Sequence, residues 1–181
     1  MKPEGFQGIR TPRSLCIRVA RDFPGTAEQL RNVHGSVLIL GAPGWGKTTL
    51  LRDLIRQKAD QGAFMAVVDE REELFPPGFP TGHGLDILSG CPKQTGIELL
   101  LKTMGPSIIA VDEITSAEDA QALLHCTGCG TELLATIHAA DSSDLKRKSF
   151  YRPFLEHNVF TTIVVMHPDK SWHLERSEKW A

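Results

Sequence analysis

Short apolar runs recur along the chain, and the stretches between them are long enough to hold a helix. The runs are four to seven residues long and are dominated by Val, Ile, Leu and Ala; they lie at residues 37–40, 63–68, 108–111, 133–137 and 160–166. Runs of this kind are typical of strands that are buried on both faces of a parallel sheet. The pattern therefore predicts five buried strands.

Helical spacing appears between these runs. Apolar residues recur at this spacing at Leu50, Leu51, Leu54 and Ile55, and again at Ile97, Leu100, Leu101 and Met104. We expect Gly62 to end the first helix and Gly105-Pro106 to end the second. Thr115 and Ser116 can cap a third helix, with Glu118 and Asp119 in its first turn. Strands that alternate with helices predict an α/β fold, in which a mostly parallel central sheet has helices on both faces.

The remaining segments carry weaker signals. Residues 15–21 alternate apolar and polar side chains over part of their length, which favours a strand. Thr26 can cap a short helix that has Glu28 in its first turn. A loop rich in Pro and Gly spans residues 76–84, and loops of this kind beside a ligand site are often functional. A last short strand is expected near residues 172–174.

Composition and charge narrow the class of protein. The chain has 181 residues, 41% hydrophobic content and a net charge of −2, which suits one globular domain and gives no electrostatic case for binding nucleic acid or a membrane. The basic run at residues 146–148 is best explained as a solvated helix face. No apolar stretch approaches the length of a membrane-spanning helix, and residues 1–5 show no secretory signal, so we expect a cytoplasmic location.

The cysteines raise the question of a metal site. The segment His125-Cys126-Thr127-Gly128-Cys129 superficially suggests metal or redox chemistry, but no second Cys/His pair stands at zinc-finger spacing. Free cysteine is among the most buried residue types, so we expect small buried thiols here. The sequence leaves open whether Cys126 and Cys129 ever bind metal.

One motif predicts a nucleotide site. The segment 41–48, Gly-Ala-Pro-Gly-Trp-Gly-Lys-Thr, matches the G-x-x-x-x-G-K-[ST] phosphate-binding loop and stands between an expected strand and an expected helix. The cofactors predicted are therefore ATP and Mg²⁺. Lys47 can reach the β- and γ-phosphates, and the Thr48 hydroxyl can bind Mg²⁺. The expected nucleotide-binding residues are Gly41, Ala42, Pro43, Gly44, Trp45, Gly46, Lys47, Thr48 and Thr49.

Two carboxylates follow the expected strand 108–111. Asp112 is placed as a Walker B aspartate, which would hold Mg²⁺ together with Thr48. Glu113 comes next and can orient the water that attacks the γ-phosphate, or accept its proton. Ligands of parallel sheets bind at the carboxyl ends of strands, and this pair lies at such an end, as the glycine-rich motif does.

Further candidate residues stand at other strand ends. In the cluster Asp69-Glu70-Arg71, Glu70 (or Glu73) can share the water-orienting role, and Arg71 can balance the carboxylates or contact phosphate; a solvated charged loop is the alternative. His138 can sense the γ-phosphate or be structural. Arg18 and Arg21 can contact phosphate across a subunit boundary, although surface salt bridges are the simpler use of both.

Six stretches of the chain carry a resemblance to a known family. The matching residues are 14–21, 41–52, 68–73, 85–88 with 91–93, 109–114 and 135–138. In these residues the chain resembles the stage III sporulation protein AA family, which is related to type II/IV secretion ATPases. Ala135-Thr136-Ile137-His138 is similar to the histidine box of that group. The match covers roughly residues 14–140 in family order.

The resemblance implies more than the residues alone. It implies a P-loop NTPase of RecA-like type over residues 26–181, preceded by residues 1–25 as the remnant of an N-terminal domain or linker. It also implies a homo-oligomer, specifically a hexameric ring, and membrane channel proteins as partners, with peripheral placement at the inner membrane through those partners. By the same likeness, Glu70 falls in the aspartate-box region, and Arg18 and Arg21 become inter-subunit phosphate contacts.

Three functions remain open at this point. The first is Mg²⁺-dependent ATP binding and hydrolysis that powers assembly or transport at a sporulation channel. The second is a nucleotide-gated binding module without autonomous turnover. The third is a DNA-stimulated RecA-like ATPase, against which the slightly acidic balance and the lack of a basic stripe argue. A nucleoside kinase is weaker still, because no Arg-rich lid segment is visible.

Overall fold

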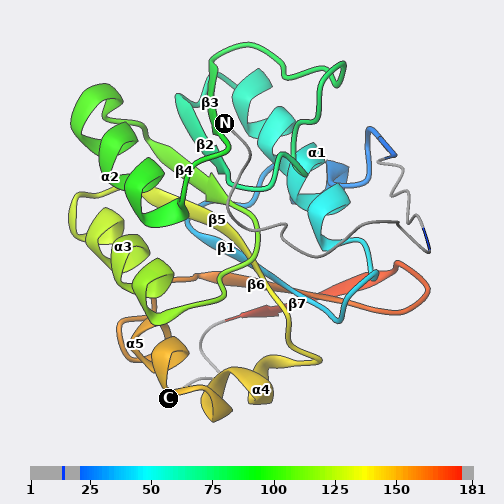
Figure 1. Ribbon diagram of the computed structural model, residues 1–181. Coiled ribbons are helices and arrows are strands. Elements are labelled where there is room, and N and C mark those ends of the chain that lie inside the picture. Colours follow the sequence, from blue (N-terminus) through cyan, green and yellow to red (C-terminus); the bar gives the residue numbers. More distant parts are fainter. Residues whose placement is uncertain (1–13, 15–20, 177–181) are drawn as a thin grey trace.

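The computed structural model describes residue 14 and residues 21–176, and its core is a seven-stranded sheet (Figure 1). The strands are β1 (Val37–Leu40), β2 (Met65–Asp69), β3 (Leu85–Ser89), β4 (Ile108–Val111), β5 (Glu132–Ile137), β6 (Thr162–Met166) and β7 (Trp172–Arg176). Their order across the sheet is β3-β2-β4-β5-β1-β6-β7, and only β7 runs antiparallel to its neighbour. The mostly parallel sheet is as predicted, and β5 lies between β1 and β4.

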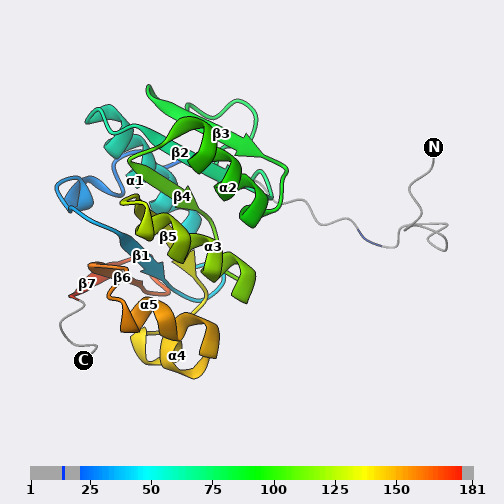
Figure 2. The same cartoon turned by 90° about the vertical axis from the view of Figure 1, so that its left-hand side faces the viewer.

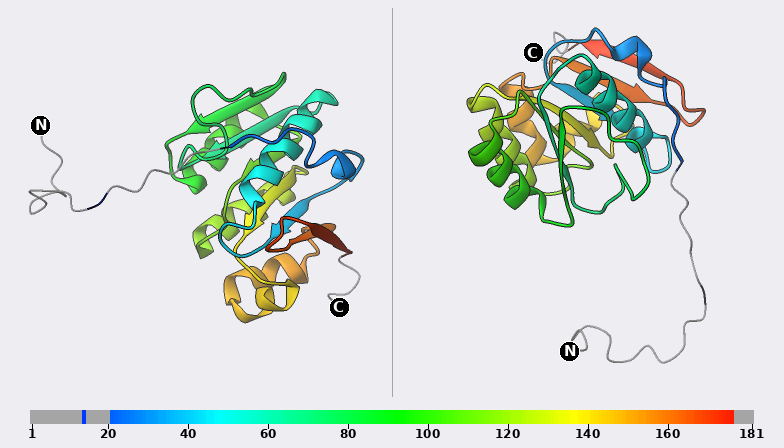
Figure 3. Two further views of the ribbon diagram at one scale, coloured as in Figure 1. Left: turned by 90° about the vertical axis from the view of Figure 1, so that its right-hand side faces the viewer. Right: turned by 90° about the horizontal axis from the view of Figure 1, so that it is seen from above.

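Helices cover both faces of the sheet, as the alternating pattern predicts. The helices are α1 (Lys47–Asp60), α2 (Lys93–Met104), α3 (Ala117–Gly128), α4 (Ser142–Arg147) and α5 (Arg152–Glu156), with 3₁₀ turns η1 (Glu28–Leu30) and η2 (Ser149–Tyr151). Figure 2 shows α2, α3 and α5 on one face, and the left view of Figure 3 shows α1 on the other. The strands are therefore buried on both sides, which explains their apolar runs.

Side-chain alternation along β1 divides the core in two. Leu38 and Leu40 pack with the apolar residues of α2, α3 and the α4–α5 region. Val37 and Ile39 pack with α1 and η1 on the opposite face. Successive side chains of a strand point to opposite faces, so one four-residue strand serves both cores. This anchors β1, and with it the loop that leads into α1, at the centre of the sheet.

The helix ends follow the predicted signals with one exception. Ser116 caps α3 in a reciprocal capping box with Asp119, and Gly105 ends α2 in the left-handed conformation. The expected cap by Thr26 is wrong: η1 has Ala27 at its N-cap and no side-chain cap bond. The carboxylate of Asp53 in α1 instead accepts the Ala27 N–H over 2.8 Å.

Two further segments differ from the expectation or lie outside it. Strand β3 was not predicted, because it is a partly exposed edge strand with Asp86 at its second position and shows no continuous apolar run. The expected strand at 15–21 falls on residues outside the described part, except for Arg21, which has no regular secondary structure. The loop at 76–84 contains no helix or strand, and the basic run 146–148 is exposed, both as expected.

Candidate functional site

Four strand ends meet at one edge of the sheet and line a single cavity. The loop of residues 41–46, hereafter the glycine-rich loop, joins β1 to α1, and the ends of β2, β4 and β5 lie beside it. The cavity has a volume of about 530 Å³. It is lined by Pro43, Gly44, Gly46, Lys47, Thr48, Thr49, Arg71, Glu73, Asp112, Glu113 and His138. The structure thus brings together most of the residues that the sequence singled out from four separate segments.

The glycine-rich loop needs glycine for two different reasons. Gly44 and Gly46 have φ values of 77° and 101°, a region that residues with a side chain rarely adopt. Gly41 is restricted by space, since a Cβ there would lie 2.9 Å from the Cβ of Met166 in β6. The loop therefore packs tightly on β6 and presents backbone groups at the N-terminus of α1, where the helix dipole favours an anion.

Lys47 begins α1 and is held against its own loop. Its Nζ donates a hydrogen bond to the Ala42 carbonyl oxygen over 3.1 Å, and the residue is only 5% exposed. Burial lowers the pKa of Lys47, while the negative charges of Asp112 and Glu113 oppose that shift. Lys47 is thus a mostly buried residue that lines the cavity, and its positive charge is attracted by two carboxylates.

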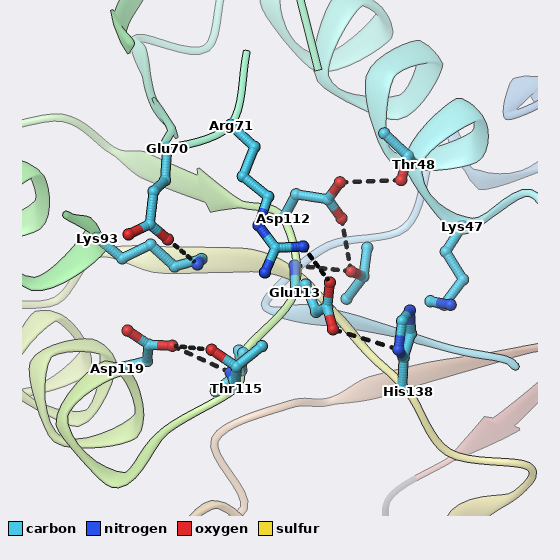
Figure 4. A network of polar contacts seen from close by, with 12 residues as sticks. Lys47, Thr48, Glu70, Arg71, Lys93, Asp112, Glu113, Thr115, Asp119 and His138 are labelled. Atoms are coloured by element: carbon cyan, nitrogen blue, oxygen red, sulfur yellow. Dashed lines mark hydrogen bonds and ion pairs between the residues drawn. The ribbon is translucent and has the colours of Figure 1, made fainter. Parts of the chain in front are cut away.

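A threonine on either side holds the carboxylate of Asp112. The Thr136 hydroxyl donates to Asp112 Oδ1 over 2.7 Å. The Thr48 hydroxyl donates to Asp112 Oδ2 over 2.9 Å (Figure 4). This joins the first turn of α1 to the end of β4. A hydroxyl and a carboxylate side by side supply the hard oxygen ligands that Mg²⁺ prefers, so these residues fit that ion.

Thr136 is a site residue that the sequence analysis placed in the histidine-box motif but to which it gave no role. It is fully buried in β5, and its Oγ1 also accepts the Glu113 N–H over 2.9 Å. One hydroxyl therefore fixes both the side chain of Asp112 and the backbone of Glu113. The available signal was a polar residue inside the apolar run 133–137, two positions before His138.

The carboxylate of Glu113 lies between two basic side chains. Glu113 Oε2 is 3.4 Å from Nη1 of Arg71, and Oε1 is 3.2 Å from Nδ1 of His138 (Figure 4). Its backbone has a φ of 49°, a left-handed conformation that costs a non-glycine residue roughly 1–2 kcal/mol. Strained residues of this kind cluster at functional sites.

The backbone around Glu113 is held from two directions. The Ile114 N–H donates to the Thr136 carbonyl over 2.9 Å, and the Tyr151 hydroxyl donates to the Ile114 carbonyl over 2.8 Å. Tyr151 is buried in η2, and burial together with the charge of Glu113 raises its pKa to about 12. The strained conformation of Glu113 is thus imposed by its neighbours in β5 and η2.

His138 directly follows β5 and lies near both the positive charge of Lys47 and the negative charges of Glu113 and Asp112. Burial and the positive charge of Lys47 lower its pKa, although Glu113 and Asp112 act in the opposite direction. A neutral imidazole can still donate from Nδ1 to the Glu113 carboxylate. The position is the one expected from the sequence.

The cluster after β2 divides into separate contacts. Arg71 turns toward Glu113, whereas Glu70 forms an ion pair with Lys93 at the start of α2 and does not line the 530 Å³ cavity (Figure 4). Asp69 is buried and accepts the N–H groups of Glu73, Leu74 and Phe75, each over 2.9 Å, so it shapes the loop. Among the carboxylates after β2, Glu73 reaches the cavity lining instead of Glu70.

The remaining candidates lie away from this cavity or outside the described residues. Arg18 falls outside the described part of the chain. Arg21 is exposed, and it lines a second, adjoining cavity.

The two neighbouring cysteines differ in burial. Burial raises the pKa of the Cys126 thiol to about 12, whereas Cys129 is exposed. The expectation of buried thiols is therefore right for Cys126 and wrong for Cys129. Within the described residues, no three His, Cys, Asp or Glu side chains are grouped to hold a metal.

The family follows from comparison with known sequences. The family model for sporulation stage III, protein AA matches residues 2–173. The chain belongs to this family. Stage III sporulation protein AA of Bacillus subtilis (strain 168) is 34% identical over 171 residues, which are 86% of this chain and 56% of that protein. Protein SEEDLING PLASTID DEVELOPMENT 1 of Arabidopsis thaliana is 32% identical over 68% of this chain and 20% of its own length. The chain thus spans about half or less of these relatives.

Solved structures share the fold. The ATPase DotB of Legionella pneumophila matches with a TM-score of 0.62 at 19% sequence identity. The match covers 88% of this chain and 51% of the DotB chain. The VirB11 ATPase of the Brucella suis type IV secretion system, solved with sulphate, matches with the same score and identity over 85% of this chain and 51% of its own. The family member described here therefore has the fold of secretion ATPases. In its described residues, no helix is both long and apolar enough to cross a bilayer.

Proposed function

We propose that this domain binds Mg·ATP and hydrolyses it, as a P-loop NTPase of RecA-like type. The observation that carries the proposal is the 2.9 Å contact between Thr48 Oγ1 and Asp112 Oδ2. It brings the hydroxyl that follows the motif lysine beside the first carboxylate after β4, although β5 separates β4 from β1. These two residues would hold Mg²⁺, which supplies charge neutralisation for the phosphates when bound.

The glycine-rich loop would bind the phosphate chain. Its backbone N–H groups and the N-terminus of α1 favour an anion, and Lys47, the first residue of α1, places its ammonium group against the Ala42 carbonyl of the loop. A phosphate group would offer this ammonium a stronger, charge-assisted partner than the Ala42 carbonyl. We therefore assign phosphate binding to residues 41–49.

Glu113 is the carboxylate that we assign to the attacking water. It lines the cavity beside Asp112, and its backbone is fixed by Thr136. His138 and Arg71 contact its two oxygens, so they would orient the carboxylate or move from it to the transferring phosphate. Glu70 is held by Lys93, which leaves it a supporting role at the end of β2.

The relatives suggest what the turnover would drive. The B. subtilis relative is named as a sporulation protein, and the structural neighbours are ATPases of secretion systems or a pilus retraction motor. We propose that the whole protein powers assembly or transport at a sporulation channel as a homo-oligomeric, hexameric ring that contacts membrane channel proteins. Arg18 and Arg21 are the proposed phosphate contacts across the subunit boundary. Nucleic acid is not an expected partner.

One observation favours a second candidate, a nucleotide-gated module without turnover of its own. Both oxygens of the Glu113 carboxylate are engaged, Oε2 by Arg71 over 3.4 Å and Oε1 by His138 over 3.2 Å, so both contacts would compete with an attacking water for this carboxylate. In that case the chain would bind ATP and change its contacts with a partner, and a further domain or subunit would have to release Glu113 before hydrolysis.

Phosphate release with Mg·ATP over a protein-concentration series tests the proposal. An assembling ATPase should show turnover that rises more steeply than protein concentration. Lys47→Ala should abolish binding and turnover, whereas Glu113→Gln should keep binding and lower turnover at least a hundredfold, since general base catalysis contributes about 10²–10⁴-fold. Background turnover with intact binding would favour the gated module, and stimulation by single-stranded DNA would favour the DNA-dependent alternative.

A further inference from the structure

The β6–β7 hairpin reaches the glycine-rich loop from a distant part of the sequence. Lys170, in the turn of the hairpin, donates a hydrogen bond from Nζ to the carbonyl oxygen of Gly44, 126 residues away. Its Cδ would lie 3.6 Å from a Cβ at Gly46. Since Lys47 donates to the Ala42 carbonyl, two ammonium groups lie on carbonyls of the same short loop.

The backbone of Lys170 is strained in a position that usually holds glycine. Its φ is 72°, its N–H donates to the His167 carbonyl over 3.0 Å, and the His167 N–H donates to the Ser171 carbonyl over 2.9 Å. This is a three-residue hairpin loop whose last residue is left-handed, where glycine has no steric cost. Strain in a residue whose side chain reaches the candidate site suggests that the side chain has a function.

The same hairpin forms a wall of a second cavity that adjoins the first. This cavity has a volume of about 840 Å³ and shares Gly44, Gly46, Thr48, Thr49 and Glu73 with the cavity described above. Trp172, two residues after Lys170, lines it together with the half-exposed ring of Phe23. Aromatic walls that adjoin a phosphate-binding loop provide a surface on which a planar base can stack.

Charged residues of α1 hold the opposite wall in place. Arg52 donates to the Arg21 carbonyl over 3.0 Å, and Arg56 binds Asp22 through two contacts of 2.6 Å. Asp53 accepts the Ala27 N–H. Phe23 therefore stands on a segment that is fixed to the helix on both sides, although the segment has little regular structure of its own.

We propose that the β6–β7 hairpin supplies the second half of the nucleotide site, an inference that rests on the proposed function. Lys170 binds the phosphate chain at the end of the glycine-rich loop that Lys47 does not cover. Trp172 and Phe23 bind the base in the adjoining cavity. A phosphate oxygen replaces the Gly44 carbonyl as the partner of the Lys170 ammonium group, which makes the contact charge-assisted.

Titrations with two different ligands can distinguish the phosphate contacts of this site from its base contacts. Calorimetric titration with Mg·ATP measures phosphate and base contacts together, and titration with Mg·tripolyphosphate measures phosphate contacts alone. Lys170→Gly should weaken the binding of both ligands about tenfold, the effect of losing one charged hydrogen bond. Its melting temperature should stay level or rise, because glycine relieves the strain. Lys170→Arg should restore most of the affinity, and Asn158→Gly, at another left-handed residue (φ 47°), is the matched control.

Substitutions of Trp172 test the proposed contact with the base. Trp172→Ala should weaken Mg·ATP binding about tenfold and leave tripolyphosphate binding unchanged, because stacking on one aromatic side chain contributes roughly that factor. Trp172→Phe keeps a ring and should retain most of the affinity, which also covers the case in which the alanine variant does not fold. Leu174→Ala, an exposed apolar residue of the same strand outside the cavity lining, is the control.

The outcomes distinguish this inference from the function on which it rests. An unchanged ATP affinity in Lys170→Gly or in Trp172→Ala would overturn the hairpin proposal, while loss of binding in Lys47→Ala would still uphold the phosphate site. ATP or tripolyphosphate binding that survives Lys47→Ala would overturn the proposed function itself.

Discussion

The hydroxyl of Thr136 donates to Asp112 Oδ1 over 2.7 Å and accepts the backbone N–H of Glu113 over 2.9 Å. A single buried side chain of β5 therefore positions both acidic residues after β4. Thr136→Val should lower the free energy of unfolding by about 1–3 kcal/mol, because it removes the partner of two partly buried groups, the Asp112 carboxylate and the Glu113 N–H. Chemical denaturation measures this loss, and ATP turnover should fall in the same variant.

Thr136→Ser is the matched control, because it keeps the hydroxyl and loses only a methyl group. It should retain most of the stability and turnover. If Thr136→Val and Thr136→Ser behave alike, the loss comes from packing, and the hydroxyl has no positioning role.

His138 should make stability depend on pH. Its pKa is lowered from 6.5 in the folded state by burial and by Lys47, so the unfolded chain binds a proton more readily. The chain should therefore lose stability as the pH falls below about 6.5 toward the lowered pKa. Melting temperatures of the wild type and His138→Gln between about pH 5 and 8 measure this, and the wild type should show the steeper decline on the acid side. Parallel profiles would mean that the His138 pKa is not lowered.

Tyr151 offers a direct optical test of the packing around the Glu113 loop. It is the single tyrosine of the chain, and burial raises its pKa to about 12. Phenolate absorbance should therefore show a midpoint near that value in the native state and near the ordinary value of about 10 in denaturant. A native midpoint near 10 would show that the Tyr151 hydroxyl is in water and does not hold the Ile114 carbonyl.

Asp53 should support both stability and nucleotide binding. The residue is 3% exposed, and its carboxylate accepts the N–H groups of Gly25 and Ala27. Asp53→Ala should cost about 1–3 kcal/mol in the free energy of unfolding, because the buried Ala27 N–H loses its acceptor. It should also weaken Mg·ATP binding through displacement of Phe23. Asp60→Ala, at an exposed aspartate of the same helix, should change neither quantity, and equal effects of the two variants would contradict this account.

Most of the parallel strands were predictable, because a strand that is buried on both faces is a continuous run of apolar residues. Such a run can be recognised without knowing which strands lie beside it. Strand β3 carries no such run, since it lies at the sheet edge and is only partly buried. The cap at Ser116 was predictable because its partner, Asp119, lies within one turn of the same helix. The cap expected at Thr26 was wrong, because Asp53 binds the nearby N–H groups from a different helix. Local signals are thus reliable where no distant side chain competes for the same backbone groups.

The sequence by itself determined the candidate chemistry: the motif at 41–48, the pair Asp112-Glu113 and the residues at the other strand ends are visible as patterns along the chain. Only the tertiary structure decided which of them meet. Arg71 reaches Glu113 while its neighbour Glu70 turns to Lys93, and Lys170 reaches the glycine-rich loop across 126 residues. These contacts depend on strand order and on side-chain direction, which arise from the packing of the whole sheet and leave no periodic trace in the sequence.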